Sequence, residues 1–349
     1  MTEFTRRQIL GAPLAAIAPR KRYSYYAPAI RSTVSEDVHW TPARPPVMKG
    51  EQFNMVIACD YAKRIYGIIG GRQAWYKDFE LWPRGMSLCE GLLYVIDDPL
   101  IVALDPMTGV PVLKIEVPGY HARLNAVHVA RVFGELRLTL CFDRGGDTTM
   151  SPGESVHCFR LMNGILLDPY LCTINSIHPR DACMTRAGQL LVADTFGNQV
   201  LLIDPARDEL ISVADEYFPN SVQELQDGWV LVCSEHGNRV IRWNPSTSER
   251  RMIFSAPIYP FNDIRMGSER IRELEVGTSD PDSDVAPARS LCAIQNAGLA
   301  TLYSPNSARQ RDGAILVADT DNHRVIVLRD GSIVTDVTGL NNPVNAVWL

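Results

Sequence analysis

Residues 179–205 of this 349-residue chain read PRDACMTRAGQLLVADTFGNQVLLIDP, and two other stretches repeat the pattern. Residues 219–245 read PNSVQELQDGWVLVCSEHGNRVIRWNP, and residues 305–331 read PNSARQRDGAILVADTDNHRVIVLRDG. Each stretch has an opening proline, a short strand, a turn with glycine, an apolar strand, a turn with asparagine and another apolar strand. The first two prolines are 40 residues apart, and the third follows after another 86. Repeats of about forty residues built from short strands are typical of β-propellers, so the sequence predicts an all-β propeller.

The two ends of the chain carry complementary parts of one repeat. Residues 341–349, NNPVNAVWL, match only an opening strand. Residues 54–70, NMVIACDYAKRIYGIIG, supply two apolar strands without an opening strand before them. Further repeats open near Trp82 and Arg123, so the count is six. The sequence therefore predicts a six-bladed β-propeller closed by pairing of the C-terminal strand with the N-terminal blade, which removes exposed sheet edges.

The predicted domain organisation is an N-terminal arm at residues 1–50 and a propeller at residues 51–349. The repeat pattern is interrupted by an irregular insertion at about residues 257–299. Long irregular segments in a compact fold are usually binding loops or lids. We therefore expect the insertion to distinguish this propeller from others.

The N-terminal arm resembles a twin-arginine export signal, because Arg6-Arg7 is followed by an apolar stretch from Ile9 to Ala18. Ala27-Pro28-Ala29 is a better candidate cleavage site than Ala16-Ile17-Ala18, because cleavage at the latter would leave Pro19 directly after the cut. Processing at Ala27-Pro28-Ala29 predicts a periplasmic or secreted protein. The alternative is a basic, tyrosine-rich arm that is retained and docks on a neighbouring subunit, which predicts an unprocessed subunit of an assembly.

Composition limits the classes of partner that the chain is expected to bind. The net charge is −6 and the pI about 5.7, so no nucleic acid is expected to bind the propeller body. No apolar run approaches the ~20 residues that span a bilayer, so no transmembrane segment is expected. Cys59, Cys141 and Cys233 end predicted buried strands, where a free thiol packs as a small apolar group.

The combination of Pro-x-x-Ala, an apolar strand, Ala-Asp-Thr, Asn-x-x-Val and Ile-Asp-Pro resembles NHL-repeat and related six-bladed propellers. The resemblance covers residues 51–349 apart from the insertion. It implies the fold, whereas related propellers include lactonases, lyases and interaction modules, so no single activity follows. Within the repeats, Asp194 and Asp319 are expected to accept hydrogen bonds from backbone N–H groups of the next turn. Asn198, Asn238 and Asn322 suit turn positions with a left-handed backbone.

Innermost strands line the axis of a propeller, and the residues near their starts share one mouth. Six residues stand two positions after an opening proline or its equivalent: Gly85, Asn125, Asp181, Ser221, Ser307 and Asn345. The five polar residues of this set predict either a polar, water-filled channel or a small-molecule or ion site, with Asp181 as its only charge.

A metal site is a further candidate, because His121 and His178 precede opening strands and Asp181 lies close to the second. Two imidazoles and one carboxylate are a ligand set for zinc. Asp280, Asp282 and Asp284 alternate as in a calcium loop, although the glycine and glutamate of an EF-hand are missing. Surface or turn histidines and a solvated acidic run are the structural alternatives. No cofactor is expected, and zinc and calcium are the candidate ions.

Three functions fit these observations. The leading hypothesis is a non-enzymatic propeller that recognises a protein partner or small-molecule ligand through its loop-bearing mouth. The second is a metal-dependent hydrolase or lyase with its site at the axial mouth. The third is a structural subunit of a cellular or viral assembly anchored by its N-terminal arm. The sequence lacks a phosphate-binding loop and a nucleophile elbow, which favours the first.

Overall fold

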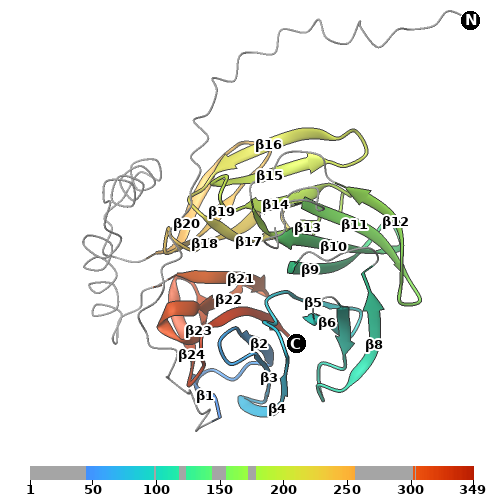
Figure 1. Cartoon of the computed structure of the whole chain (residues 1–349). Coiled ribbons are helices and arrows are strands. Elements are labelled where there is room, and N and C mark those ends of the chain that lie inside the picture. Colours follow the sequence, from blue (N-terminus) through green and yellow to red (C-terminus); the bar gives the residue numbers. More distant parts are fainter. Residues whose placement is uncertain are drawn as a thin grey trace, which may run out of the picture. The chain divides into compact units, whose positions relative to one another are not determined.

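A computed structural model describes residues 45–97, 100–117, 123–143, 155–171, 178–255, 302 and 304–349, all within a compact unit that runs from His39 to Leu349. The described residues form six antiparallel sheets arranged as the blades of a propeller (Figure 1). The predicted all-β, six-bladed fold is confirmed. The predicted export signal, the insertion at 257–299 and His121 lie outside the described residues.

Each blade is one sheet, numbered here from the blade that contains both chain ends. Blade 1 comprises β25 (Pro343–Trp348), β2 (Met55–Cys59), β3 (Arg64–Ile69) and β4 (Arg72–Asp78). Blade 2 comprises β5 (Met86–Cys89), β6 (Leu92–Asp97), β7 (Leu100–Leu104) and β8 (Pro111–Glu116). Blade 3 comprises β9 (Arg123–Val132), β10 (Glu135–Asp143), β11 (Ser155–Met162) and β12 (Ile165–Leu171).

The other three blades contain the repeats that are clearest in the sequence. Blade 4 comprises β13 (Pro179–Met184), β14 (Leu190–Asp194), β15 (Gln199–Asp204) and β16 (Glu209–Asp215). Blade 5 comprises β17 (Pro219–Glu224), β18 (Val230–Ser234), β19 (Arg239–Trp243) and β20 (Arg250–Ser255). Blade 6 comprises β21 (Pro305–Arg311), β22 (Ala314–Asp319), the 3₁₀ turn η1 (Thr320–Asn322), β23 (Arg324–Arg329), β24 (Ser332–Thr338) and β1 (Val47–Gly50).

The second strand of a blade is buried on both faces, which explains its continuous apolar sequence. Every residue of β2, β14, β18 and β22 is buried. Neighbouring blades supply the covering side chains: one hydrophobic cluster, for example, joins Leu191 and Val200 of blade 4 to Val232 and Trp243 of blade 5. Burial of these faces between blades is the main stabilising contribution. Cys59, Cys141 and Cys233 are fully buried, as predicted.

The ring closes through both ends of the described chain. The innermost strands contact one another in the order β25, β5, β9, β13, β17, β21 and back to β25. In blade 1, β25 pairs with β2 so that Val347 lies opposite Val56, which confirms the predicted closure. A second closure was not predicted: β1 pairs with β24 as a fifth strand of blade 6. β1 lies on the N-terminal side of the boundary that the sequence predicted at residue 51.

The opening strands contain a β-bulge that decides which side chains face the mouth. In blades 4, 5 and 6 the pairing register shifts between the proline and the second residue after it, as between Pro179 and Asp181. The same shift leaves Val344 unpaired in blade 1 and Asn125 unpaired in blade 3. A bulge of this kind re-aims the extra residue. The residue directly after the proline therefore differs in orientation from the one that follows it.

The turns between the second and third strands link each blade to the next. Asn198 and Asn238 have left-handed backbones, as predicted, but the third such residue is His323 and not Asn322, which lies in η1. Each side chain accepts a hydrogen bond from the backbone N–H that precedes the next opening proline. The donors are Phe218 to Asn198 Oδ1 at 3.0 Å, Ser304 to Asn238 Oδ1 at 2.8 Å and Asn342 to His323 Nδ1 at 3.2 Å.

The strand-end carboxylates also act within these turns. Asp194 Oδ2 accepts a hydrogen bond from Gln199 Nε2 at 2.7 Å, and Asp319 Oδ2 accepts one from Arg324 Nε at 2.7 Å. Asp194 packs so closely on Gly197 that a Cβ there would lie 1.9 Å from Oδ2. The carboxylates therefore shape the turns through the donors that follow them.

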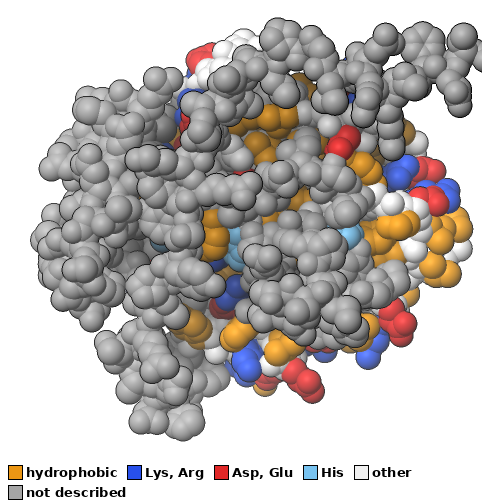
Figure 2. All heavy atoms as spheres, turned by 45° about the horizontal axis from the view of Figure 1, so that its top comes forward, with side chains coloured by type: hydrophobic (Ala, Val, Ile, Leu, Met, Phe, Trp, Pro, Cys, Tyr) orange, Lys and Arg blue, Asp and Glu red, His pale blue; other side chains and the backbone are white. Residues whose placement is uncertain are grey.

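The described residues contain no helix with the length and hydropathy of a membrane span. Figure 2 shows acidic and basic side chains interspersed on the described part of one face of the molecule.

Candidate functional site

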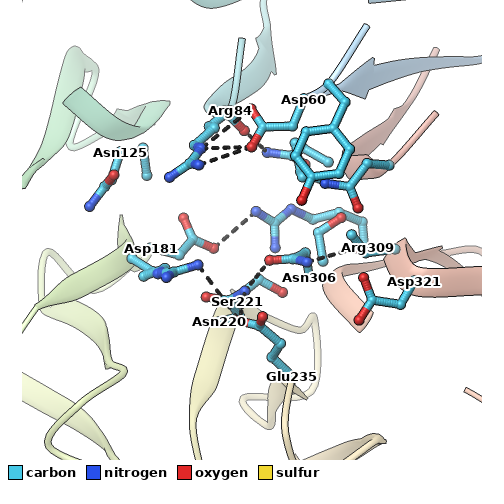
Figure 3. A pocket seen from close by; sticks show the side chains of 18 residues that line it. Asp60, Arg84, Asn125, Asp181, Asn220, Ser221, Glu235, Asn306, Arg309 and Asp321 are labelled. Atoms are coloured by element: carbon cyan, nitrogen blue, oxygen red, sulfur yellow. Dashed lines mark hydrogen bonds and ion pairs between the residues drawn. The ribbon is translucent and has the colours of Figure 1, made fainter. Parts of the chain in front are cut away.

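Residues from all six blades line one cavity at the mouth of the axis (Figure 3). Its volume is about 230 Å³. The residue that follows each opening proline, or the bulged equivalent in blade 3, forms what we call the bulge ring. Its members are Arg84, Asn125, Arg180, Asn220, Asn306 and Val344.

A second ring lies one residue further along each opening strand and links the blades. We call it the staple ring: Gly85, Ala126, Asp181, Ser221, Ser307 and Asn345. Asp181 Oδ2 accepts the backbone N–H of Val222 at 3.0 Å, and Ser221 Oγ accepts that of Ala308 at 3.0 Å. Ser307 Oγ accepts that of Ala346 at 3.2 Å, and Asn345 Nδ2 donates to Arg84 O at 3.0 Å. Each of these side chains thus forms a hydrogen bond with the next blade.

The structure brings together all five residues of the predicted axial mouth, Asn125, Asp181, Ser221, Ser307 and Asn345, in the lining of this cavity. The predicted equivalence of Asn125 with the other four is wrong by one residue. Ala126 pairs with Cys141, as Asp181 pairs with Ala193. Asn125 therefore belongs to the bulge ring, and Ala126 holds the staple position.

Blade 2 has no side chain at its staple position. A Cβ on Gly85 would lie 2.7 Å from the backbone N of Val127 and 2.9 Å from Cα of Ala126. Glycine therefore permits a close approach of blades 2 and 3. Ser87 makes the connection instead, because its Oγ accepts the N–H of Val129 at 2.9 Å.

Three ion pairs cross the cavity lining. Arg84 binds Asp60 with Nε at 3.1 Å and Nη2 at 2.9 Å. Arg180 Nη1 lies 3.6 Å from Glu235 Oε2. Asp60 and Glu235 each come directly after the second strand of their blade. At the same position, blades 4 and 6 have threonines whose hydroxyls donate to the next blade. Thr195 donates to Pro219 O and Thr320 donates to Pro343 O, both at 2.7 Å.

The third pair crosses the axis beneath the bulge ring. Arg309 of β21 reaches Asp181 of β13, with Nη2 at 3.0 Å from Oδ2, past the intervening β17 (Figure 3). Nη1 of the same guanidinium donates to Ala308 O at 3.1 Å and Val222 O at 3.4 Å. The charges of Asp181 and Arg309 also act on His128, but burial dominates and lowers the pKa of its imidazole to about 4.

Asn125 is the exception among the polar residues of the two rings. It is 5% exposed, and neither its Oδ1 nor its Nδ2 has a hydrogen-bond partner within the described part of the chain. Three further polar atoms of the lining share this condition: Arg180 Nε, Asn220 Oδ1 and Asn345 Oδ1. A buried amide without a partner costs about 1–3 kcal/mol. The cavity therefore holds polar groups that the fold leaves unpaired.

The predicted metal ligands do not converge in the described residues. His178 is buried and stacks on Phe196, with ring centroids 4.4 Å apart, and it is not among the residues that line the cavity. Asp181 lines the cavity but bonds Val222 and Arg309. Within the described ranges, no three metal-binding side chains gather. Since His121 lies outside these ranges, the metal site stays a prediction.

The sequence analysis did not predict the bulge ring or the two carboxylates that pair with it, Asp60 and Glu235. The signal for the ring was present, because Arg84, Arg180, Asn220 and Asn306 all follow an opening proline directly. Alternation along a regular strand would aim these residues away from the staple ring but would not place both rings in one cavity. The bulge does so, and no residue pattern marks it.

No family model matches the chain, and no curated protein matches it either. Solved structures match it at low identity. A protein of unknown function from Bacteroides caccae aligns with a TM-score of 0.58 and 11% identity, covering 85% of this chain and 98% of that one.

Two further structures align over similar lengths. A chain of the nidogen/laminin complex has a TM-score of 0.51 and 11% identity, covering 82% of this chain and 92% of its own. A 6-phosphogluconolactonase-like protein from Bacteroides uniformis has a TM-score of 0.51 and 14% identity, covering 85% and 99%. Likeness at this identity establishes the fold alone, so the chain is a six-bladed β-propeller, and the predicted NHL-type membership stays a prediction.

Proposed function

We propose that this protein binds a small polar molecule in the axial cavity formed by the bulge ring. The observation that carries the proposal is the Asn125 amide, which is 5% exposed and has no partner for either of its polar atoms among the described residues. An amide left unpaired destabilises the folded state, so water or a ligand in the cavity has to complete its hydrogen bonds. A ligand that accepts from Nδ2 and donates to Oδ1 would supply the missing hydrogen bonds.

The rest of the lining supports a polar ligand of modest size. The cavity of about 230 Å³ is smaller than the ~300–1,000 Å³ of drug-sized ligand sites, so it admits only a small ligand. Its walls hold Arg84, Arg180 and Glu235, with side-chain exposures of 29%, 27% and 16%. Partly buried charges of this kind orient a ligand through charge-assisted hydrogen bonds. A protein partner would have to enter the same mouth with a single side chain or a chain end.

A fragment screen tests the proposal. A set of small polar compounds is screened by ligand-observed NMR against the full chain, and each hit is repeated with Asn125→Ala. Binding in the cavity should weaken about tenfold or more in this variant. Gln73→Ala, which changes a polar residue on the outermost strand β4, should leave the affinity unchanged. The proposal would be rejected if every hit bound Asn125→Ala as tightly as the unmodified protein, or if the screen gave no saturable hit.

A further inference from the structure

The unpaired polar groups of the cavity are not mixed at random, and their arrangement points to one class of ligand. The donors lie on three successive blades: Arg84 on blade 2, Asn125 on blade 3 and Arg180 on blade 4. Arg84 spends Nε and Nη2 on Asp60, so Nη1 remains for a ligand. Arg180 lies over the Phe218 ring, 5.9 Å from its centroid, and pairs with Glu235 at 3.6 Å, and its buried Nε has no hydrogen-bond partner among the described residues.

Apart from Asn125 Oδ1, the unpartnered acceptor atoms that the described residues place in the lining lie on the opposite blades: Asn220 and Asn345 present their Oδ1 atoms from blades 5 and 1. Two carboxylates add negative charge there, Glu235 of blade 5, whose Oε2 also accepts from Asn220 Nδ2 at 2.8 Å, and Asp321 of blade 6. In Figure 3, Asn125 lies on one side of the cavity and Asp321 on the opposite side. The cavity therefore has a donor side and an acceptor side.

Charge balance then selects among polar ligands. The lining contains three arginines and four carboxylates, so a ligand that is only an anion would add to a negative excess. A ligand that is only a cation would leave the Arg180 and Asn125 donors unpaired. A molecule that carries a carboxylate and an ammonium group satisfies both sides, because guanidinium and amide N–H groups recognise carboxylates and carboxylates recognise ammonium.

We infer that the axial cavity binds a small zwitterion of the free amino acid class, an inference that rests on the proposed function. Its carboxylate lies against Arg84, Asn125 and Arg180, and its ammonium group faces Glu235 and Asp321. The rim adds an apolar surface for a side chain. Tyr61 lines the cavity and is 67% exposed, and Trp82, 38% exposed, lies over the Arg84 guanidinium at 5.4 Å from its ring centroid.

Three matched probes test this inference on the unmodified protein: L-phenylalanine, L-phenyllactate and L-phenylalaninamide at neutral pH. They share a side chain and differ in charge, being a zwitterion, an anion and a cation. Calorimetric titration should give L-phenylalanine an affinity at least about tenfold above both others. An equal or higher affinity for phenyllactate or phenylalaninamide would overturn the inference, as would the absence of binding by all three.

Variants then locate the two charged groups. Arg180→Gln should weaken L-phenylalanine and L-phenyllactate about tenfold and spare L-phenylalaninamide. Glu235→Gln should do the reverse, weakening the two amines and sparing phenyllactate. Arg207→Gln is the matched control, since this arginine is 73% exposed on blade 4 away from the cavity. A loss that is equal for all three probes would contradict the two-sided arrangement.

The outcome separates this inference from the proposed function. If other fragments bind in a manner that depends on Asn125 while the amino acid does not, the cavity is a binding site for a different chemical class. If no compound depends on Asn125, both fail. The comparison of the three probes requires no variant, so it stands even where Arg180→Gln does not fold.

Discussion

Ser221 Oγ accepts a hydrogen bond of 3.0 Å from the backbone N–H of Ala308, which lies in the opening strand of the next blade. Ser307 repeats this contact with Ala346, and Asp181 repeats it with Val222. Residues predicted to face a channel thus hold neighbouring blades together while they line the cavity. The propeller is closed not only by the pairing of its chain ends but also by a hydrogen bond of this kind at several interfaces between blades.

Removal of a staple should destabilise the ring. Ser221→Ala and Ser307→Ala each leave a buried backbone N–H without a partner, so we expect each to lower the free energy of unfolding by about 1–3 kcal/mol. Urea denaturation followed by tryptophan fluorescence measures the change. Ser332→Ala, at the exposed first residue of β24, is the control and should change stability by less than about 0.5 kcal/mol. Equal effects for all three serines would contradict the staple role.

Asn125→Ala should behave in the opposite way. Because its amide has no partner among the described residues, its removal in the absence of ligand should leave the free energy of unfolding unchanged or raise it by about 1 kcal/mol. The same variant should lose ligand binding. A stability gain coupled to a functional loss is typical of a residue retained for function. A marked destabilisation would show instead that Asn125 supports the fold.

The ion pair between Glu216 and Arg239 should be strongly asymmetric under mutation. Arg239 Nη2 lies 2.7 Å from Glu216 Oε1, and the two side chains are 6% and 0% exposed. Arg239→Leu leaves a buried carboxylate unpaired, and we expect a loss of about 3–5 kcal/mol. The double variant with Glu216→Leu should recover most of this loss, because the desolvated charge is then absent. A double-mutant cycle measured by chemical denaturation tests this expectation. If the losses of the two single variants simply added in the double variant, this account would be contradicted.

Stability should fall as the pH falls below about 6.5. Burial lowers the pKa of His128 and of His157 to about 4, whereas an unfolded histidine has a pKa of about 6.5. Between these values the unfolded state binds more protons, so unfolding becomes easier by up to about 1.4 kcal/mol per pH unit for each histidine. Above pH ~6.5 both states are neutral and the full stability remains.

Denaturation across this pH window measures the slope. His157 lies between Phe142 and Phe159, with ring centroids 4.7 and 6.2 Å away. His157→Gln removes one titrating group and should reduce the slope. An unchanged slope would show that His157 does not contribute to the acid sensitivity.

Ring closure gives a last prediction. Ala346→Pro removes the N–H that binds Ser307 and disrupts pairing with Ile57. We expect a loss of about 3 kcal/mol or more, with aggregation through the opened edge of β2. Val112→Pro is the control, because Val112 is exposed and lies at the register shift of the outer strand β8. Size-exclusion chromatography should show a soluble monomer for the control variant alone.

The sequence by itself determined the fold. The repeated proline, the apolar strands and the complementary ends at residues 54–70 and 341–349 each depend on local periodicity, which a single chain displays directly. The same periodicity placed Asp181, Ser221, Ser307 and Asn345 at the axis, because equivalent positions of equivalent blades face one mouth.

Only the tertiary structure decided what these residues do there. A bulge shifts the register by one residue, and its position in blade 3 depends on pairing between Leu124 and Phe142 rather than on a local motif. Arg309 meets Asp181 from 128 residues away, and Asn125 stays unpaired because Ala126 holds the staple position. Contacts between distant blades depend on how six sheets pack around the axis, and local sequence does not encode that packing.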